Sequence, residues 1–194
     1  MIVIDDFVKD SLLLKEIQND PQFLADPGVY YWWDGWWSSP ASSTRQKLVK
    51  YLWENIPLPS PIETLGFEYW TGITQPGDGK TVEDNNIVYH LGPHFDKDED
   101  LFSQTGQILS GQIGSVFYPY PDNDNCRGGH LKVWEPNGYP NGEYELIKPK
   151  FNRFVVFDIS CVHAVLEVTK GVRKAIAINL WDKYPTNYNT LIKE

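Results

Sequence analysis

The sequence contains little cysteine, methionine or histidine: two, one and four residues of 194. Two cysteines, Cys126 and Cys161, are too few for a disulfide-stapled secreted domain, and they lack the paired spacing of a zinc ribbon. No apolar stretch approaches the roughly 18 residues of a membrane span. The chain also opens without the basic flank and apolar run of a signal peptide. These absences predict a cytoplasmic protein with reduced thiols and no membrane contact.

Positive charge is scarce as well, because 17 Lys and Arg residues face 26 Asp and Glu residues, a formal net charge of −9 at pH 7. A chain with this charge and no basic cluster is poorly suited to follow a phosphate backbone, so nucleic acid is not an expected partner. Hydrophobic residues make up 41% of the chain and aromatic residues 14%, which is enough to build a core. The length suits a single domain over residues 1–194.

Two patterns of hydrophobic spacing divide this domain. Residues 1–62 are expected to form a helical flank, with one helix from about Ser11 and a second from Ser43 or Thr44 to the proline-rich end of the flank. Residues 63–194 show short strand-like runs between Gly, Pro and Asn turns, and 71–85 is expected to be a loop. We expect strands near 66–73, 86–91, 107–118, 130–135, 144–147, 153–158, 162–168 and 173–182. About eight strands without interleaved helices predict a mainly β fold, a sandwich or barrel such as the jelly roll.

The segment around His94 holds the most informative side chains. His94 and Asp96 are two residues apart, so on a strand they project to the same face. An imidazole and a carboxylate can bind a divalent metal, although a single His-x-Asp pair is more often structural. His163 lies in a later strand, after an apolar run, and a folded sheet could bring it alongside. Two histidines and one carboxylate on one face describe the facial triad of non-haem iron(II) oxygenases.

Arg173 supports the metal hypothesis. It opens the strand-like run RKAIAINLW, ten residues after His163. A cation that faces inward from an apolar strand is costly unless it meets an anion. A guanidinium beside a metal site can hold the far carboxylate of a dicarboxylate through two parallel hydrogen bonds. The pattern therefore favours a dicarboxylate co-substrate next to the metal.

Further pieces occur in order along the chain, and together they are far more specific than His-x-Asp alone. They are Tyr89 with Gly92-Pro93-His94-Phe95-Asp96, Ser115-Val116-Phe117-Tyr118, Gly128-Gly129-His130-Leu131, residues 148–154, His163-Ala164-Val165, and Arg173 leading into Trp181. With these pieces the chain resembles the prolyl 4-hydroxylase-like 2-oxoglutarate- and iron(II)-dependent oxygenases. The resemblance covers about residues 66–184 and the opening IVIDDFV.

The resemblance implies a double-stranded β-helix core with iron ligands at His94, Asp96 and His163. It also implies that Arg173 pairs with the distal carboxylate of 2-oxoglutarate, that Tyr118 adds a hydrogen bond, and that Tyr89 lines the same pocket. The implied cofactors are Fe(II), 2-oxoglutarate as co-substrate and O2, with ascorbate as an optional reductant. The implied reaction is hydroxylation of a substrate C–H bond, coupled to decarboxylation of 2-oxoglutarate to succinate.

The resemblance favours a peptide or protein side chain as substrate, with proline among the candidates and a small molecule as the alternative. Asn179 stands six residues after Arg173, where nucleic-acid-demethylating relatives usually carry a second arginine, so the sequence departs from them. Two other functions stay open: a metal-free jelly-roll module that binds carbohydrate, and a cupin-like metalloenzyme that does not use 2-oxoglutarate. The dense aromatic segment 30–37 is expected to pack in a core or interface, or else to form a platform that stacks on a ligand.

Other polar residues have simpler interpretations. His90 and His94 are four apart, but the Gly-Pro pair between them would break the helix that a zincin motif needs. The acidic runs 96–100 and 122–125 lack the glycine and glutamate positions of an EF-hand and are expected to be solvated loops. Cys161, among apolar neighbours, is expected to be an inert buried thiol.

Overall fold

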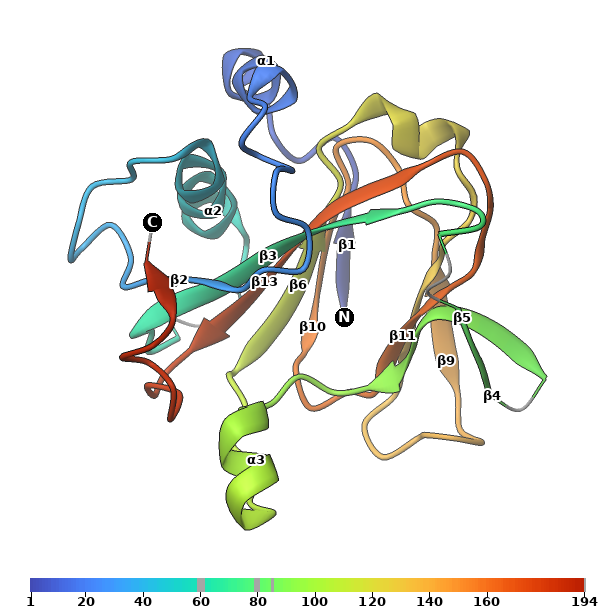
Figure 1. Ribbon diagram of the computed structural model, residues 1–194. Coiled ribbons are helices and arrows are strands. Elements are labelled where there is room, and N and C mark those ends of the chain that lie inside the picture. Colours follow the sequence, from blue (N-terminus) through green and yellow to red (C-terminus); the bar gives the residue numbers. More distant parts are fainter. Residues whose placement is uncertain (59–61, 79–80, 85, 194) are drawn as a thin grey trace.

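The computed structural model describes residues 1–58, 62–78, 81–84 and 86–193, and its framework is two facing, largely antiparallel sheets (Figure 1). The larger sheet has the strand order β1 (Ile2–Ile4), β10 (Phe154–Asp158), β6 (Ile113–Phe117), β13 (Arg173–Trp181), β3 (Gly66–Thr74), β2 (Tyr31–Trp33), β14 (Ile192–Lys193). The smaller sheet has the order β4 (Val82–Asp84), β5 (Ile87–His94), β11 (His163–Leu166), β8 (Leu131–Trp134), β9 (Tyr144–Ile147). A separate pair joins β7 (Arg127–Gly128) to β12 (Val168–Lys170). This arrangement confirms the expected double-stranded β-helix core.

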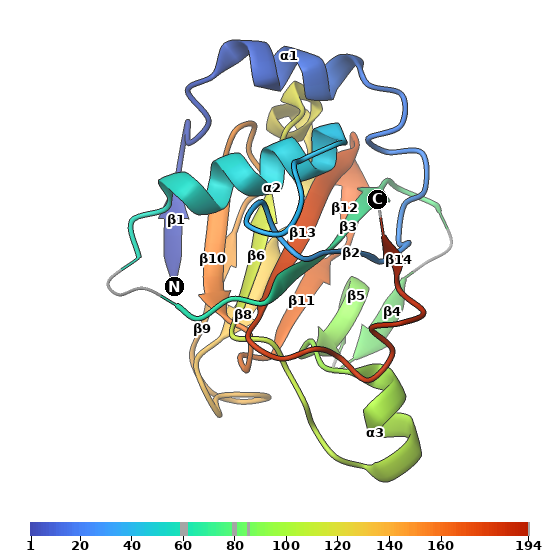
Figure 2. The same cartoon turned by 90° about the vertical axis from the view of Figure 1, so that its left-hand side faces the viewer.

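The two expected helices of the flank are present and lie on the outer side of the larger sheet (Figure 2). Helix α1 (Ser11–Asn19) begins where the Asp10 carboxylate accepts hydrogen bonds from the first free backbone N–H groups. Helix α2 (Thr44–Asn55) is capped in the same way by the Ser43 hydroxyl. Within the described residues, no helix is long and apolar enough to cross a membrane. A cytoplasmic location stays a prediction.

Strand β13 contributes side chains to two different hydrophobic cores. Its side chains alternate between the sheet's faces, because successive residues of a strand point to opposite sides. Ile176 and Ile178 belong to the core beneath the helices, which also contains Leu48 and Leu52 of α2. Ala175 belongs to a second core between the two sheets. The helices therefore cover the outer face, while the inner face of the larger sheet is left to form a site.

The aromatic segment 30–37 contributes mainly to packing. Residues 31–33 form β2, and the Trp32 and Trp33 side chains are buried. The Trp33 ring lies 6.2 Å from that of Phe67, centroid to centroid, in the core under the helices. Tyr30 differs, because its side chain is 50% exposed and its ring contacts Trp70 on β3. The packing interpretation is thus confirmed for β2.

Two expectations about the β region are wrong. The stretch 71–85 is not one loop: β3 continues to Thr74, paired with Arg173 of β13, and β4 pairs with β5. Residues 79, 80 and 85 lie outside the described part. Helices also interrupt the strands, namely α3 (Glu99–Thr105) and the 3-10 helix η1 (Pro121–Asn125). None of the α3 side chains is buried, so the sequence has no apolar periodicity from which this helix could be predicted.

The loop before β10 ties the N-terminal segment to the barrel through Asn152. Its buried side chain accepts a hydrogen bond from the Val8 N–H at 2.9 Å and donates one to the Val8 carbonyl at 3.0 Å. Its backbone N–H donates to the Tyr118 carbonyl, and its φ is +57°. Asparagine suits this position because it tolerates the left-handed region and bonds locally.

We expect Asn152→Ala to lower the free energy of unfolding by about 2–4 kcal/mol, since it removes two buried hydrogen bonds and replaces an asparagine, which tolerates positive φ, by an alanine, which tolerates it less well. Urea denaturation measures the change. The matched control is Asn137→Ala, because Asn137 also has positive φ (+61°) but is exposed. Equal losses in the two variants would show that the Val8 hydrogen bonds contribute nothing.

Candidate metal centre

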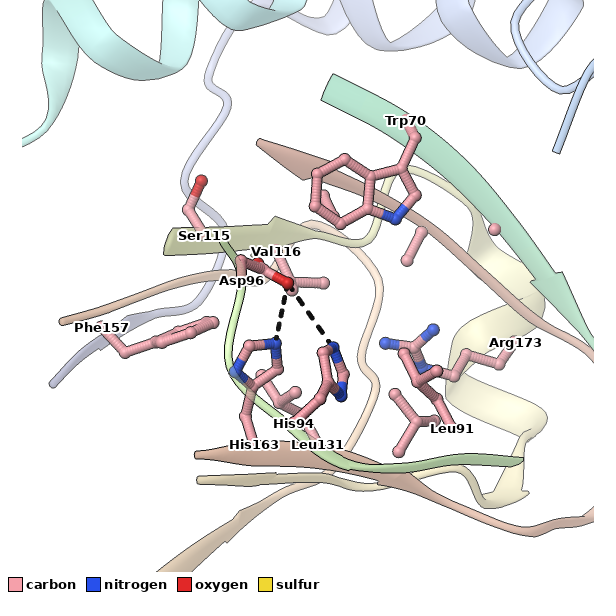
Figure 3. Close-up of a pocket in the computed structure, with 14 residues that line it drawn as sticks. Trp70, Leu91, His94, Asp96, Ser115, Val116, Leu131, Phe157, His163 and Arg173 are labelled. Carbon is pink, nitrogen blue, oxygen red and sulfur yellow. Dashed lines mark ion pairs between the residues drawn. The ribbon is translucent and has the colours of Figure 1, made fainter. Parts of the chain in front are cut away.

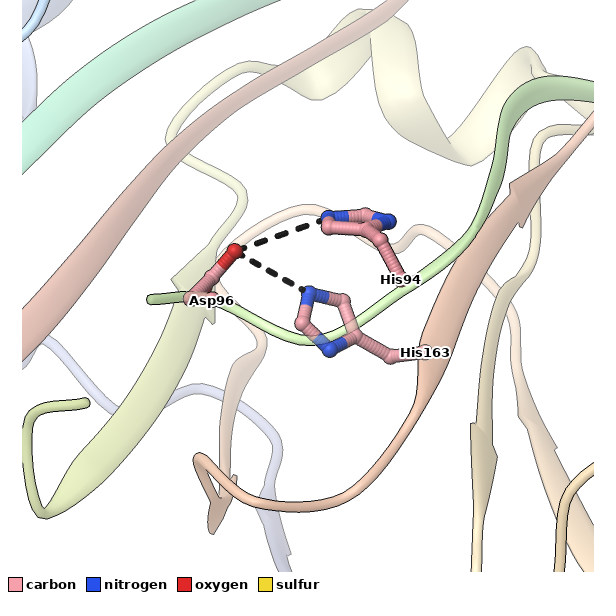
Figure 4. A group of neighbouring side chains, drawn as sticks. All are labelled: His94, Asp96 and His163. Carbon is pink, nitrogen blue, oxygen red and sulfur yellow. Dashed lines mark ion pairs between the residues drawn. The ribbon is translucent and has the colours of Figure 1, made fainter. Parts of the chain in front are cut away.

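Three side chains converge between the sheets (Figure 4). Strand β5 ends at His94 and β11 begins at His163, and antiparallel pairing places these two residues directly opposite each other. Asp96 follows β5 by two residues. Its Oδ1 lies 3.5 Å from the Nε2 of His94 and 3.7 Å from the Nε2 of His163. The expected meeting of the three residues is therefore present in the structure.

Each histidine is held with one nitrogen facing the centre. The Nδ1 of His94 lies 2.8 Å from the Gly92 carbonyl oxygen, and the Nδ1 of His163 lies 3.1 Å from that of Cys161. A carbonyl oxygen can only accept, so both Nδ1 atoms carry a proton, and the Nε2 atoms, which face Asp96, are the nitrogens that a metal could bind once the imidazoles are neutral. Asn179 donates from Nδ2 to the Oδ2 of Asp96 at 3.1 Å, which leaves Oδ1 facing the histidines. Such bonds orient metal ligands.

The charges of the three residues depend on one another. Burial by itself raises the pKa of Asp96, but the His94 hydrogen bond and the charges of both histidines hold that pKa below its usual value. Burial opposes the charged form of His94, yet its bond to Asp96 raises its pKa. Burial lowers the pKa of His163, which favours the neutral imidazole that a metal needs. The centre thus combines one anionic oxygen with imidazole nitrogens.

This donor set fits a divalent transition metal. One ligand atom from each residue can be chosen so that all lie within 4.8 Å of one another. Atoms bound to one such ion at about 2.1 Å lie about 3–4 Å apart, so a small inward movement would complete the site. Two histidines and one carboxylate on one side leave the opposite positions open, and this arrangement favours iron(II).

Arg173 points into a cavity that adjoins the triad (Figure 3). The remaining walls are mainly apolar, with Leu91, Val116, Leu131, Phe157 and Val165 among them. Arg173 is buried, and within the described residues its Nε has no hydrogen-bond partner and its guanidinium forms no ion pair with a carboxylate. Its Nη2 donates to the Tyr118 hydroxyl at 3.4 Å. A buried cation with open donors is suited to an anionic group in this cavity.

The paired glycines predicted to form a turn lie beside Arg173. Gly128 and Gly129 both have positive φ, +73° and +64°. A Cβ on Gly129 would lie 3.2 Å from the Cδ of Arg173 and 2.9 Å from a Val168 methyl, and a Cβ on Gly128 would overlap the Glu167 carbonyl oxygen. Only glycine fits both the conformation and the space. The turn therefore lets the chain pass close to the guanidinium.

The structure separates the two tyrosines expected near the co-substrate. Tyr118 is buried next to Arg173, with the guanidinium carbon 5.2 Å from its ring centroid. Tyr89 instead packs with Trp134 and Ala164 in a small separate cluster, and it is not among the described residues that line the cavity. Tyr89 lies five residues before His94, an odd number, so strand alternation counted from His94 already places it on the other face of the sheet. Burial raises the pKa of Tyr89.

The residues set aside as functional candidates have structural roles, but the acidic runs are not the expected solvated loops, because both are partly helical and Asp98 and Asn123 within them are buried. His90 lies 3.3 Å from the Oδ2 of Asp78, away from the triad. In the acidic runs, Asp98 caps α3, and Asp122 pairs with Lys174. Burial raises the pKa of the Cys161 thiol, in keeping with an inert side chain, but its carbonyl orients His163.

A wider groove continues from the cavity and shares Trp70, Leu91, His94 and Asp96 with it. Its other walls come from residues 29–30, β3, the start of α3, the end of β13 and the segment 185–192. Two groove residues, Glu68 and Trp70, were not singled out from the sequence, and Asn179 was noted only as a departure from a family pattern. Strand alternation counted outward from Arg173 would have placed Asn179 on the inner face.

Comparisons with known proteins agree with this geometry. A family model described as the 2OG-Fe(II) oxygenase superfamily matches residues 85–181, half of the chain. The fold is similar to a Pseudomonas putida prolyl-4-hydroxylase, with 15% identity, 94% of this chain and 92% of that chain covered, and a TM-score of 0.52. It is also similar to a prolyl 4-hydroxylase from Phytophthora capsici, with 16% identity, coverage of 97% and 59%, and a TM-score of 0.51. No curated protein matches significantly in sequence.

We expect His94→Ala, Asp96→Ala and His163→Ala each to weaken Mn(II) binding at least about tenfold, because each removes one of three protein ligands. Calorimetry on the metal-free protein measures the affinity, and circular dichroism checks the fold. The matched control is His130→Ala, since His130 lies outside the triad. Wild-type affinity in any triad variant would remove that residue from the ligand set.

Proposed function

We propose, because this chain belongs to the 2OG-Fe(II) oxygenase superfamily, that His94, Asp96 and His163 hold its iron and that Arg173 holds its 2-oxoglutarate. The chain is a 2-oxoglutarate-dependent dioxygenase, and Fe(II), 2-oxoglutarate and O2 are its cofactors and co-substrates. One observation carries the residue assignment: the triad lines the same cavity as Arg173, whose guanidinium forms no ion pair with a carboxylate of the described residues. The metal-free carbohydrate module and the cupin-like enzyme without 2-oxoglutarate are therefore set aside.

The bound iron, with 2-oxoglutarate and O2, supplies the oxidising power that inserts oxygen into a substrate C–H bond while 2-oxoglutarate becomes succinate. The protein's own residues set the geometry of this chemistry. Asn179 holds Oδ2 of Asp96, so Oδ1 is left to bind. Arg173 offers paired N–H donors to the distal carboxylate, and Tyr118 supports the guanidinium. The apolar walls around the cavity exclude water from the reacting groups.

The proposed substrate is a side chain of a peptide or protein, with proline among the candidates. The groove beside the triad supports this choice, because it runs past β3, α3 and the segment 185–192 and so can take an extended ligand. A similar fold occurs in the Pseudomonas putida prolyl-4-hydroxylase. Ascorbate as a reductant, the exclusion of nucleic acid and the single domain 1–194 stay predictions.

We expect Arg173→Ala to weaken 2-oxoglutarate binding by roughly 2–5 kcal/mol, since the buried carboxylate loses its cationic partner. Tyr118→Phe should cost only about 0.5–1.5 kcal/mol, one hydrogen bond. Calorimetric titration of the Mn(II)-loaded protein without O2 gives both values. Lys174→Ala is the matched control, because Lys174 is the next cation along β13 but pairs with Asp122. If Arg173→Ala binds 2-oxoglutarate with unchanged affinity, a group other than Arg173 holds its distal carboxylate.

The activity itself is tested by incubation with Fe(II), 2-oxoglutarate and O2. We expect succinate formation by the wild-type protein and none by His163→Ala, and a peptide library should contain products that have gained one oxygen atom. Mass spectrometry identifies the modified residue. Succinate formation at the wild-type rate by His163→Ala would contradict the assignment. If only small molecules gain oxygen, the substrate is a small molecule and the proposed peptide substrate is wrong.

A further inference from the structure

The groove beside the triad is acidic. Five carboxylate residues line it: Glu68, Asp96, Asp98, Glu99 and Asp100. Lys97 is the one Lys or Arg among its described lining residues, and its Nζ already bonds the Oε1 of Glu99 at 2.7 Å. Most of the acidic groups are also engaged, because Asp98 accepts backbone hydrogen bonds and Asp96 belongs to the triad. Glu68 differs, because the polar side chains that stabilise its charged form, Trp181 and Asn179, are neutral.

Glu68 sits opposite Asn179 in the β3–β13 pairing, so one residue separates it from Asp96. Among the residues that the structure describes, no basic side chain forms an ion pair with it. Burial, followed by the charge of Asp96, raises the pKa of Glu68 to about 7, and the polar side chains of Trp181 and Asn179 offset this only in part. A carboxyl in this position lacks a cation.

An aromatic wall stands next to this carboxyl. Glu68 and Trp70 are two apart on β3 and therefore share its inner face. Both line the groove, and the Trp70 ring lies 4.8 Å from that of the half-exposed Tyr30, centroid to centroid. Partial burial, followed by the charges of Asp96, Glu68 and Glu99, raises the pKa of Tyr30 to about 12. Aromatic faces beside a carboxylate are suited to an ammonium or guanidinium group.

The β3–β13 pairing orders the charges along the site. Arg173 stands at one end, next to the cavity proposed for 2-oxoglutarate, and Asn179 with Glu68 stands six residues away at the other. Six residues of strand span about 20 Å. The triad lines the same cavity as Arg173, and Asp96 also contacts Asn179, so the triad lies between the two ends. An anion is favoured at one end of this interior face and a cation at the other.

From these contacts we infer that the substrate carries a positively charged group, which binds Glu68 against Trp70 and Tyr30 while the reacting C–H bond faces the triad. This inference rests on the proposed function and narrows its substrate class. Two sources supply such a group: a basic side chain in a peptide, or a free alkyl amine. In both, the ammonium or guanidinium gives the Glu68 carboxyl a cationic partner, which it lacks among the described residues.

The test uses matched probes and the Mn(II)-loaded protein with 2-oxoglutarate, because Mn(II) broadens the NMR signals of protons near it without turnover. One arm compares a capped lysine pentapeptide, Ala-Ala-Lys-Ala-Ala, with its norleucine analogue. The other arm compares n-hexylamine with n-hexanol. We expect the charged member of at least one pair to bind at least about tenfold more tightly and to be the more broadened. The arm that responds identifies the source of the cation.

Variants separate a specific contact from general attraction. Glu68→Gln keeps the shape of the side chain and should abolish at least about nine-tenths of the preference for the charged probe. Asp100→Asn removes the same charge from another groove residue and should change that preference less than about twofold. Tyr30→Leu, at a half-exposed position, should lower the preference for the charged probe about twofold to fivefold. This variant provides the test if Glu68→Gln does not fold.

Three results would overturn the inference: equal binding within both pairs, wild-type preference in Glu68→Gln, or an equal loss in Asp100→Asn. Mn(II) and 2-oxoglutarate affinities are measured first on each protein. If the wild-type protein binds neither, the proposed function fails. If it binds both without preferring the charged probes, only the inference fails.

Discussion

The site depends on the antiparallel pairing of β5 with β11. This pairing sets His94 opposite His163, so two imidazoles from residues 69 positions apart in the chain lie next to each other. Backbone carbonyls of Gly92 and Cys161, each two residues before a histidine, then fix which ring nitrogen carries the proton. A one-residue slip of either strand would turn one histidine to the other face. The register is therefore the physical constraint on which the metal centre rests.

The larger sheet supplies the other polar residues of the site, which the β5–β11 pairing does not provide. Strand β13 lies in the middle of that sheet and is buried on both faces, with Ile176 and Ile178 under the helices and Arg173 and Asn179 toward the triad. The helices of the flank thus act on the site indirectly, because they cover the outer face and hold β13 in place. Polar residues on the inner face of β13 can therefore bind ligands without disturbing the hydrophobic core under the helices. The proposed binding of an anion and of a cation uses this one face.

Much of the site could be predicted from the sequence, and the misses have definable causes. His94, Asp96, His163 and Arg173 were identifiable because their types and order narrow the chemistry, and strand alternation brings the first two together. The family resemblance placed Tyr89 in the pocket, but Tyr89 lies an odd number of residues before His94 and packs in a cluster with Trp134. Helix α3 was missed because it buries no side chain, and β4 because its pairing with β5, rather than local propensity, makes it a strand.

The sequence by itself determined the helical flank, the mainly β core and the four residues to which we propose to assign the chemistry. These follow from local patterns: capping residues, periodicity and the pairing of residue types with spacing. Only the tertiary structure decided that Asn179 holds Asp96 and that Glu68 lies one residue from the triad. It also decided that, among the residues the structure describes, Arg173 forms no ion pair with a carboxylate and Glu68 forms none with a basic side chain. Such facts depend on which side chains of distant strands meet across a sheet, and no local pattern contains that information.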